Sequence, residues 1–88
     1  MIVNTGQFSV STTPVKVVSA NEVGRIVHLN CKTNEDIYIA GDNTVSTSTG
    51  FYIPKGNHLF QVQIDANDEL WCIAATGTHT VTVMTVTQ

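Results

Sequence analysis

Short runs of alternating apolar and polar residues are the feature that most limits what this chain can fold into. In the clearest run, residues 25–32, the side chains of Val27, Leu29 and Cys31 share one face, as the two-residue period of a β-strand requires. Turn-forming residues separate such runs about every 8–12 residues, and no segment has a convincing helical period. This pattern predicts an all-β fold, a small antiparallel β-sandwich or flattened barrel of about six to eight strands.

The segments expected to be strands are residues 2–10, 16–20, 25–32, 37–40, 51–53, 58–65, 69–75 and 79–87. In the last segment Val81 and Val83 share one face, whereas Met84 and Val86 share the other. Either a bulge shifts its register or its two ends pack against different surfaces. The expected core consists of inward-facing aliphatic side chains, namely Val27, Leu29, Ile37, Ile39, Val62, Ile64 and Leu70.

With 88 residues and no linker or internal repeat, the chain is expected to be a single β domain, residues 1–88. Residues 1–14 have two interpretations. They are either the first strand or an N-terminal arm that reaches a neighbouring subunit, because Pro14 ends an apolar segment that contains Ile2, Val3 and Phe8.

The charge composition favours assembly over a role with nucleic acid. Charged residues make up 12% of the chain, against roughly 25% in an average domain. We therefore expect part of the surface to be covered by other subunits, the alternative being a Thr-rich domain with an ordinary surface. The net charge is −3 and the four basic residues are scattered, which argues against a nucleic-acid partner. We also expect no signal peptide and no membrane span, since no apolar run approaches about 20 residues.

The sequence contains no motif typical of catalysis or of a cofactor site, so we expect a protein that is not an enzyme and binds no cofactor or metal ion. It has neither a nucleophile elbow nor a phosphate-binding glycine loop. His28, His58 and His79 lack a second ligand at i+2 or i+4, and we expect them on the surface. The acidic segment 65–69 lacks the features of an EF-hand loop and is interpreted as a turn.

The two cysteines, Cys31 and Cys72, lie within apolar strand patterns. We interpret them as buried thiols. The alternative is a disulfide between them, which requires that their strands be neighbours.

Aromatic side chains and one long loop are candidate contact sites. Tyr38, Phe51, Tyr52 and Trp71 would serve either as a platform for sugar or peptide or as packing in the core and between subunits. The loop at residues 41–50 is rich in Ser and Thr and has few apolar anchors. We expect it to be mobile in the free protein and ordered against a partner.

Several stretches of the chain resemble small virion proteins of tailed bacteriophages. These stretches are DIYIAG at residues 36–41, the Ser/Thr segment 45–50, FYIPKG at 51–56, DELWCIAA at 68–75 and GTHTVTV at 77–83. The resemblance covers roughly residues 24–87 and is a pattern of strands and turns. The chain departs from it at Ala40, where half of a glycine pair would stand.

The resemblance implies a capsid decoration (cement) protein, which stabilises the phage head through subunit contacts. Such a protein is made in the host cytoplasm, is located on the capsid surface of the virion, and binds copies of itself and the major capsid protein. We favour a trimer. The candidate assembly contacts are Ile2, Val3, Phe8, Val45, Phe51, Tyr52 and Trp71.

Two alternatives stay open. One is a carbohydrate- or receptor-binding β-module of a phage tail or head fibre that uses Tyr38, Tyr52 or Trp71. The other is a secreted β domain, which would require paired cysteines.

Overall fold

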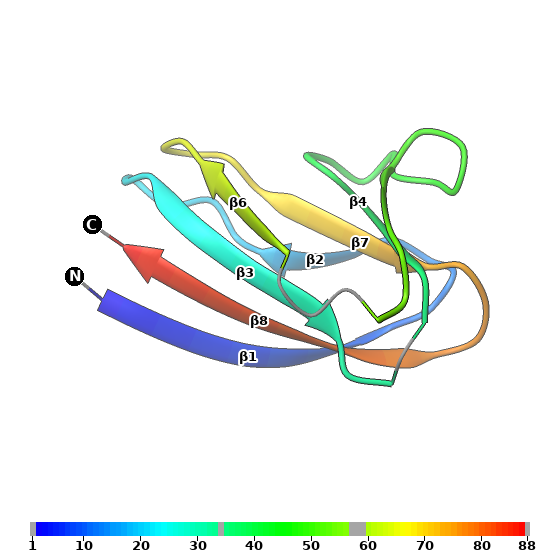
Figure 1. The fold of residues 1–88 in the computed structure, drawn as a ribbon. Coiled ribbons are helices and arrows are strands. Elements are labelled where there is room, and N and C mark those ends of the chain that lie inside the picture. Colours follow the sequence, from blue (N-terminus) through cyan, green and yellow to red (C-terminus); the bar gives the residue numbers. More distant parts are fainter. Residues whose placement is uncertain (1, 34, 57–59, 88) are drawn as a thin grey trace.

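The computed structural model describes residues 2–33, 35–56 and 60–87, which form two antiparallel four-stranded sheets (Figure 1). Sheet A has the strand order β1-β8-β3-β6 and sheet B the order β2-β7-β4-β5. This confirms the predicted β-sandwich, and the described residues include no helix that could cross a membrane. The strands are β1 (Ile2–Val10), β2 (Val15–Val18), β3 (Arg25–Cys31), β4 (Ile37–Ala40), β5 (Phe51–Ile53), β6 (Gln61–Ile64), β7 (Leu70–Ala74) and β8 (His79–Thr87).

Sheet A is organised around β8, the last strand of the chain. Along its whole length β8 pairs with β1, from Ile2 opposite Thr87 to Val10 opposite His79. On its other side it pairs with β3, again without a register shift. The bulge considered for the last strand is therefore wrong. Val81 and Val83 are buried on the inner face, while Met84 lies half-buried on the outer face of the same regular strand.

Residues 2–10 form β1, which pairs with β8 of the same chain. Of the two interpretations of the N-terminal segment, the structure therefore has the first strand and not the arm. The strand predicted at 16–20 lies at Val15–Val18. Its register shifts between Lys16 and Val18, so Val17 and Val18 are both buried. The strand predicted at 58–65 lies at Gln61–Ile64, and residues 58 and 59 fall outside the described part of the chain.

The core lies between the two sheets and consists mainly of the predicted aliphatic side chains. Val62 differs from the expectation, because it is only partly buried at the margin of the core. The other predicted core residues are all buried, namely Val27, Leu29, Ile37, Ile39, Ile64 and Leu70.

The loop at residues 41–50 folds over the outer face of sheet B. Its Val45 is 4% exposed, and it lines a small hollow together with Ile73, an outward-facing residue of β7 that is also 4% exposed. Val45 is therefore a packing residue, and its assignment as an assembly contact is corrected. This packing was not predicted, because Val45 and Ile73 lie far apart in the sequence.

Hydrogen bonds inside the same loop hold it together. Ser46 Oγ accepts bonds from the backbone amides of Ser48 and Thr49, each at 3.2 Å. The amide of Gly50 donates to the carbonyl of Ser46 at 2.8 Å. These bonds close a turn within the loop. The expected mobility of the loop in the free protein stays a prediction, which hydrogen exchange at residues 43–49 tests.

Replacement of Leu29 by alanine tests the core assignment. Leu29 is 2% exposed, and large-to-small changes at such sites lower the free energy of unfolding by about 2–5 kcal/mol. We expect this loss in urea unfolding followed by circular dichroism. The control Gln63→Ala, at an exposed position of the same sheet, should change it by less than about 0.5 kcal/mol. An unchanged urea midpoint for Leu29→Ala would contradict the inner-face assignment of β3.

Candidate functional site

β1 has the longest free edge of the described strands. β1 lies at the margin of sheet A, with β8 on one side and no strand on the other among the described residues (Figure 1). Its nine residues, IVNTGQFSV, include no charge and no proline, and its pairing with β8 contains no bulge. In natural proteins a charged side chain, a proline or a β-bulge on an edge strand usually prevents it from pairing with another chain. The β1 edge therefore offers unpaired N–H and C=O groups to another chain.

Apolar side chains extend from this edge onto the outer face of sheet A. Val3 is 54% exposed and lies opposite Val86, which in turn lies opposite Ile26. Met84 follows on the same face of β8. A strand that paired with β1 would thus find an apolar row beside the backbone hydrogen bonds.

The side chains of β1 that point toward the opposite sheet become more buried from the start of the strand to its end. Ile2 is 60% exposed, Phe8 is half-buried against the core, and Val10 is fully buried. The reason is that β2, in the opposite sheet, has only four residues and covers the inner face of β1 incompletely. Of the predicted contacts in this segment, Ile2 and Val3 are available to a partner, and Phe8 mostly belongs to the core.

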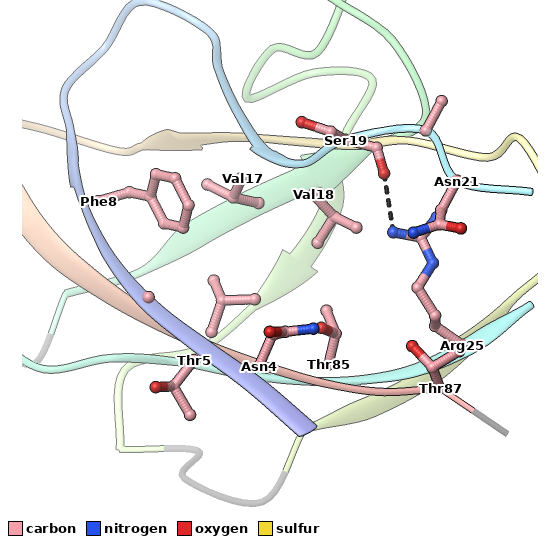
Figure 2. Close-up of a pocket in the computed structure, with 13 residues that line it drawn as sticks. Asn4, Thr5, Phe8, Val17, Val18, Ser19, Asn21, Arg25, Thr85 and Thr87 are labelled. Carbon is pink, nitrogen blue, oxygen red and sulfur yellow. Dashed lines mark hydrogen bonds between the residues drawn. The ribbon is translucent and has the colours of Figure 1, made fainter. Parts of the chain in front are cut away.

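The gap left beside β1 is a pocket of about 220 Å³ between β1 and β2 (Figure 2). Phe8, Val17 and Val18 form its apolar side, and Arg25 lies at its other end (Figure 2). Arg25 is only 6% exposed. Arg25 was not among the predicted site residues, although it shares the alternating phase of Val27 and Leu29, which is the signal in the sequence that it points inward.

Phe51 and Tyr52 lie on β5, at the edge of sheet B, and are 62% and 49% exposed. The ring centroid of Phe51 lies 5.9 Å from that of Phe60. Both rings line an apolar hollow of about 370 Å³, together with Val62 and Leu70. Both predicted β5 contacts are thus accessible, but they face opposite sides of the sheet.

Three aromatic side chains share the outer face of sheet B. The ring centroids of Tyr38 and Tyr52 are 5.3 Å apart. Trp71 is half-buried on the same face, donates a hydrogen bond from Nε1 to Glu69 at 3.2 Å, and has the Lys16 ammonium 5.6 Å from its ring centroid. The structure therefore brings Tyr52 and Trp71 onto one surface, with Ile2 and Val3 elsewhere on sheet A.

No group of three or more metal-ligating side chains occurs within residues 2–33, 35–56 and 60–87. His79 bonds through Nδ1 to Thr33 Oγ1 at 2.7 Å and lies 3.5 Å from Glu35. His28 is half-buried on the outer face of sheet A, and His58 lies outside the described residues. In the acidic turn, Asp68 accepts a hydrogen bond from the backbone amide of Asp65 at 2.9 Å, a structural use of its carboxylate.

Comparisons with known proteins identify no family for this chain. No protein-family model matches it, and no curated protein matches it. Among solved structures it is similar to PliG of Aeromonas hydrophila, a periplasmic inhibitor of g-type lysozyme, at 9% sequence identity and a TM-score of 0.48, over 98% of this chain and 86% of that one. At this level the similarity carries no argument about function.

The thiol of Cys72 provides a test of the buried interior. Cys31 and Cys72 are both buried and free, and burial, with a smaller contribution from Cys31, raises the pKa of Cys72 to about 12. Because the thiolate is the reactive form, we expect Cys72 not to react with a thiol reagent such as DTNB in the folded protein at pH 8, and to react on unfolding in urea. Stability associated with this group should be complete below pH 9 and decrease as the pH rises towards 12. Rapid labelling of Cys72 in the folded state would contradict this burial.

Proposed function

We propose that this chain is a non-enzymatic structural protein that assembles with copies of itself through the free edge of β1. The observation that carries the proposal is the unguarded, nine-residue edge strand with Ile2 and Val3 exposed beside it. We further propose that the assembly is a capsid decoration layer of a tailed-phage head, with the major capsid protein as the second partner. This part rests on the sequence resemblance over residues 24–87.

The strength of such an edge contact is set by the backbone. About half of the N–H and C=O groups of an edge strand point away from its sheet. Against an equally long partner strand, the nine residues of β1 add about eight hydrogen bonds, which contribute about 4–12 kcal/mol in total. Against a four-residue edge such as β2 or β6 they add about four, which contribute about 2–6 kcal/mol. Association itself costs about 4–15 kcal/mol. The backbone alone therefore leaves one contact marginal, so the exposed apolar side chains and repetition over many copies are needed for a stable layer.

The symmetry of the assembly depends on what β1 meets. Two β1 edges that pair with each other generate a two-fold dimer, whereas a trimer requires β1 to meet a different surface of the next copy. The remaining edge strands, β2, β5 and β6, are the candidates for that surface. We favour the trimer, and in this arrangement β1 of each subunit contacts one of these shorter edges.

Addition of a charge to the β1 edge tests this assembly. Gln7 is exposed on β1, and a lysine there should oppose strand addition. We expect the wild type to have the mass of a trimer in light scattering coupled to size-exclusion chromatography, and Gln7→Lys to have the mass of one chain with an unchanged circular dichroism spectrum. The control Thr78→Lys adds the same charge in an exposed turn and should stay assembled. A monomeric wild type, or a trimeric Gln7→Lys, would overturn the proposed edge contact.

The virion part of the proposal has its own test. Gold-labelled antibodies against this chain should bind to the capsid surface of the phage particles whose genome encodes it. Labelling confined to tails or fibres, or no labelling of particles, would contradict a decoration role.

The second candidate function is a carbohydrate- or receptor-binding module of a phage fibre. It is favoured by Tyr38, Tyr52 and Trp71 on one outer face of sheet B. Stacking of sugar rings on aromatic side chains requires such a surface. It would rely on sheet B, whereas self-assembly relies on β1 of sheet A.

Substitutions of two adjacent aromatics separate these candidates. If the aromatic face binds a glycan, Tyr52→Ala should abolish binding on a glycan array, and the matched control Phe51→Ala should retain it, because adjacent residues of a strand face opposite sides. Absence of glycan binding by the wild type would exclude this candidate for the glycans on the array.

A further inference from the structure

Arg25 has an unusual position for a charged residue. It is the chain's only arginine, it begins β3, and it lies opposite Ile64 of β6 and Thr87 of β8. Its side chain points into the space between the sheets and is 6% exposed. Arginine is rarely buried to this extent unless a group of opposite charge accompanies it.

The contacts of Arg25 satisfy its guanidinium only in part. Nη1 donates to the carbonyl of Ser19 at 2.8 Å, and Nη2 donates to the carbonyl of Asp68 at 3.0 Å. Both acceptors are neutral backbone groups. Nε is buried without a hydrogen-bond partner among the described residues. A guanidinium has five N–H donors. Within the described part of the chain, these two bonds leave its positive charge without a carboxylate and Nε–H without an acceptor.

The same side chain lines the pocket between β1 and β2, which has a volume of about 220 Å³. Figure 2 shows Arg25 and Thr87 at one end of the pocket and Phe8 at the other. Asn4 and Thr85 lie between these ends, across from Val17 and Val18. The pocket therefore has a cationic end at Arg25 and an apolar end at Phe8, and both polar and apolar side chains line the space between them. The space is far larger than the roughly 30 Å³ that one water molecule occupies in the liquid.

We propose that this pocket is a binding site for a carboxylate carried on a short apolar stem. The planar guanidinium of arginine presents pairs of N–H donors that match the two oxygens of a carboxylate. A single negative charge would neutralise Arg25, the one cationic residue among those that line the pocket. The stem would contact Phe8, Val17 and Val18, while Asn4 and Thr85 would offer further hydrogen bonds.

A purely structural role for Arg25 explains less. Its bonds to Ser19 and Asp68 connect the segment after β2 to the turn after β6, which accounts for two of the donors. They do not account for a pocket that ends at a buried positive charge. A carboxylate in the pocket would place a negative charge beside it. The proposal does not rest on self-assembly, because the pocket belongs to a single chain.

Nuclear magnetic resonance of the isotope-labelled protein provides a direct test. Because the chain has one arginine, the Nε–Hε signal of Arg25 is unambiguous. Titration with pentanoate should shift this signal downfield, together with the amides of Thr85 and Thr87. The uncharged analogue pentanamide should bind at least tenfold more weakly. A blocked tripeptide with a central glutamate, compared with its glutamine counterpart, tests the same chemistry in a protein segment.

The relative affinities of pentanoate and the glutamate tripeptide distinguish a free carboxylate from an acidic side chain as the source of the ligand. If neither carboxylate shifts the Nε–Hε signal, or if the amides shift it equally, the proposal is overturned and Arg25 has a structural role only.

Variants away from Arg25 avoid the risk that loss of a buried arginine unfolds the protein. Asn4 is exposed and lines the pocket, so Asn4→Phe should fill it and reduce pentanoate binding at least tenfold in a folded protein. The matched control Gln7→Phe, at an exposed position of β1 outside this pocket, should bind as the wild type does. Equal binding by Asn4→Phe and the wild type would place the ligand elsewhere.

The same titration on Gln7→Lys keeps the two proposals separate. This variant is designed to remove the edge contact while leaving the pocket unchanged. Pentanoate binding by Gln7→Lys supports the pocket whatever the oligomeric state of the wild type. Loss of binding in this variant, with binding by the wild type, would show that the site needs a second subunit and would overturn a pocket formed by one chain.

Discussion

A sandwich of two open sheets has strands at its margins, and the backbone groups along them must be satisfied by water or by another chain. In this protein the edge strands differ in length. β2, β5 and β6 have four, three and four residues, whereas β1 has nine. β1 reaches this length because β8 pairs with every one of its residues. The pairing of the first and last strands therefore places the longest unsatisfied edge at the N-terminal segment.

The difference in length between β1 and β2 has a second consequence. Since β2 covers only part of the inner face of β1, Ile2 is exposed although it is in phase with the buried Val10. The uncovered space is the pocket that ends at Arg25. The proposed assembly edge and the proposed carboxylate site thus have one structural origin, a long strand in one sheet opposite a short strand in the other.

The candidate contacts were only partly predictable, for reasons that differ by residue. Ile2 and Val3 were identified because the N-terminal segment is apolar yet punctuated, and the structure exposes both. Val45 was misassigned because a loop with one valine gives no local sign of where that valine packs; Ile73, its neighbour in the structure, lies far along the chain. Arg25 was not predicted as a site residue because a charge normally indicates an exposed position, whereas its phase within the strand places it on the inner face.

The sequence by itself determined the strands, their faces and most of the core, because alternation and turn chemistry are local properties that each segment carries independently. Only the tertiary structure decided which strands became neighbours, since the pairings of β8 with β1 and β3 join residues fifty or more positions apart. That pairing decided which strand is an edge and how far the opposite sheet covers it. It also buried the charge of Arg25 beside an open pocket, a property that belongs to no single segment.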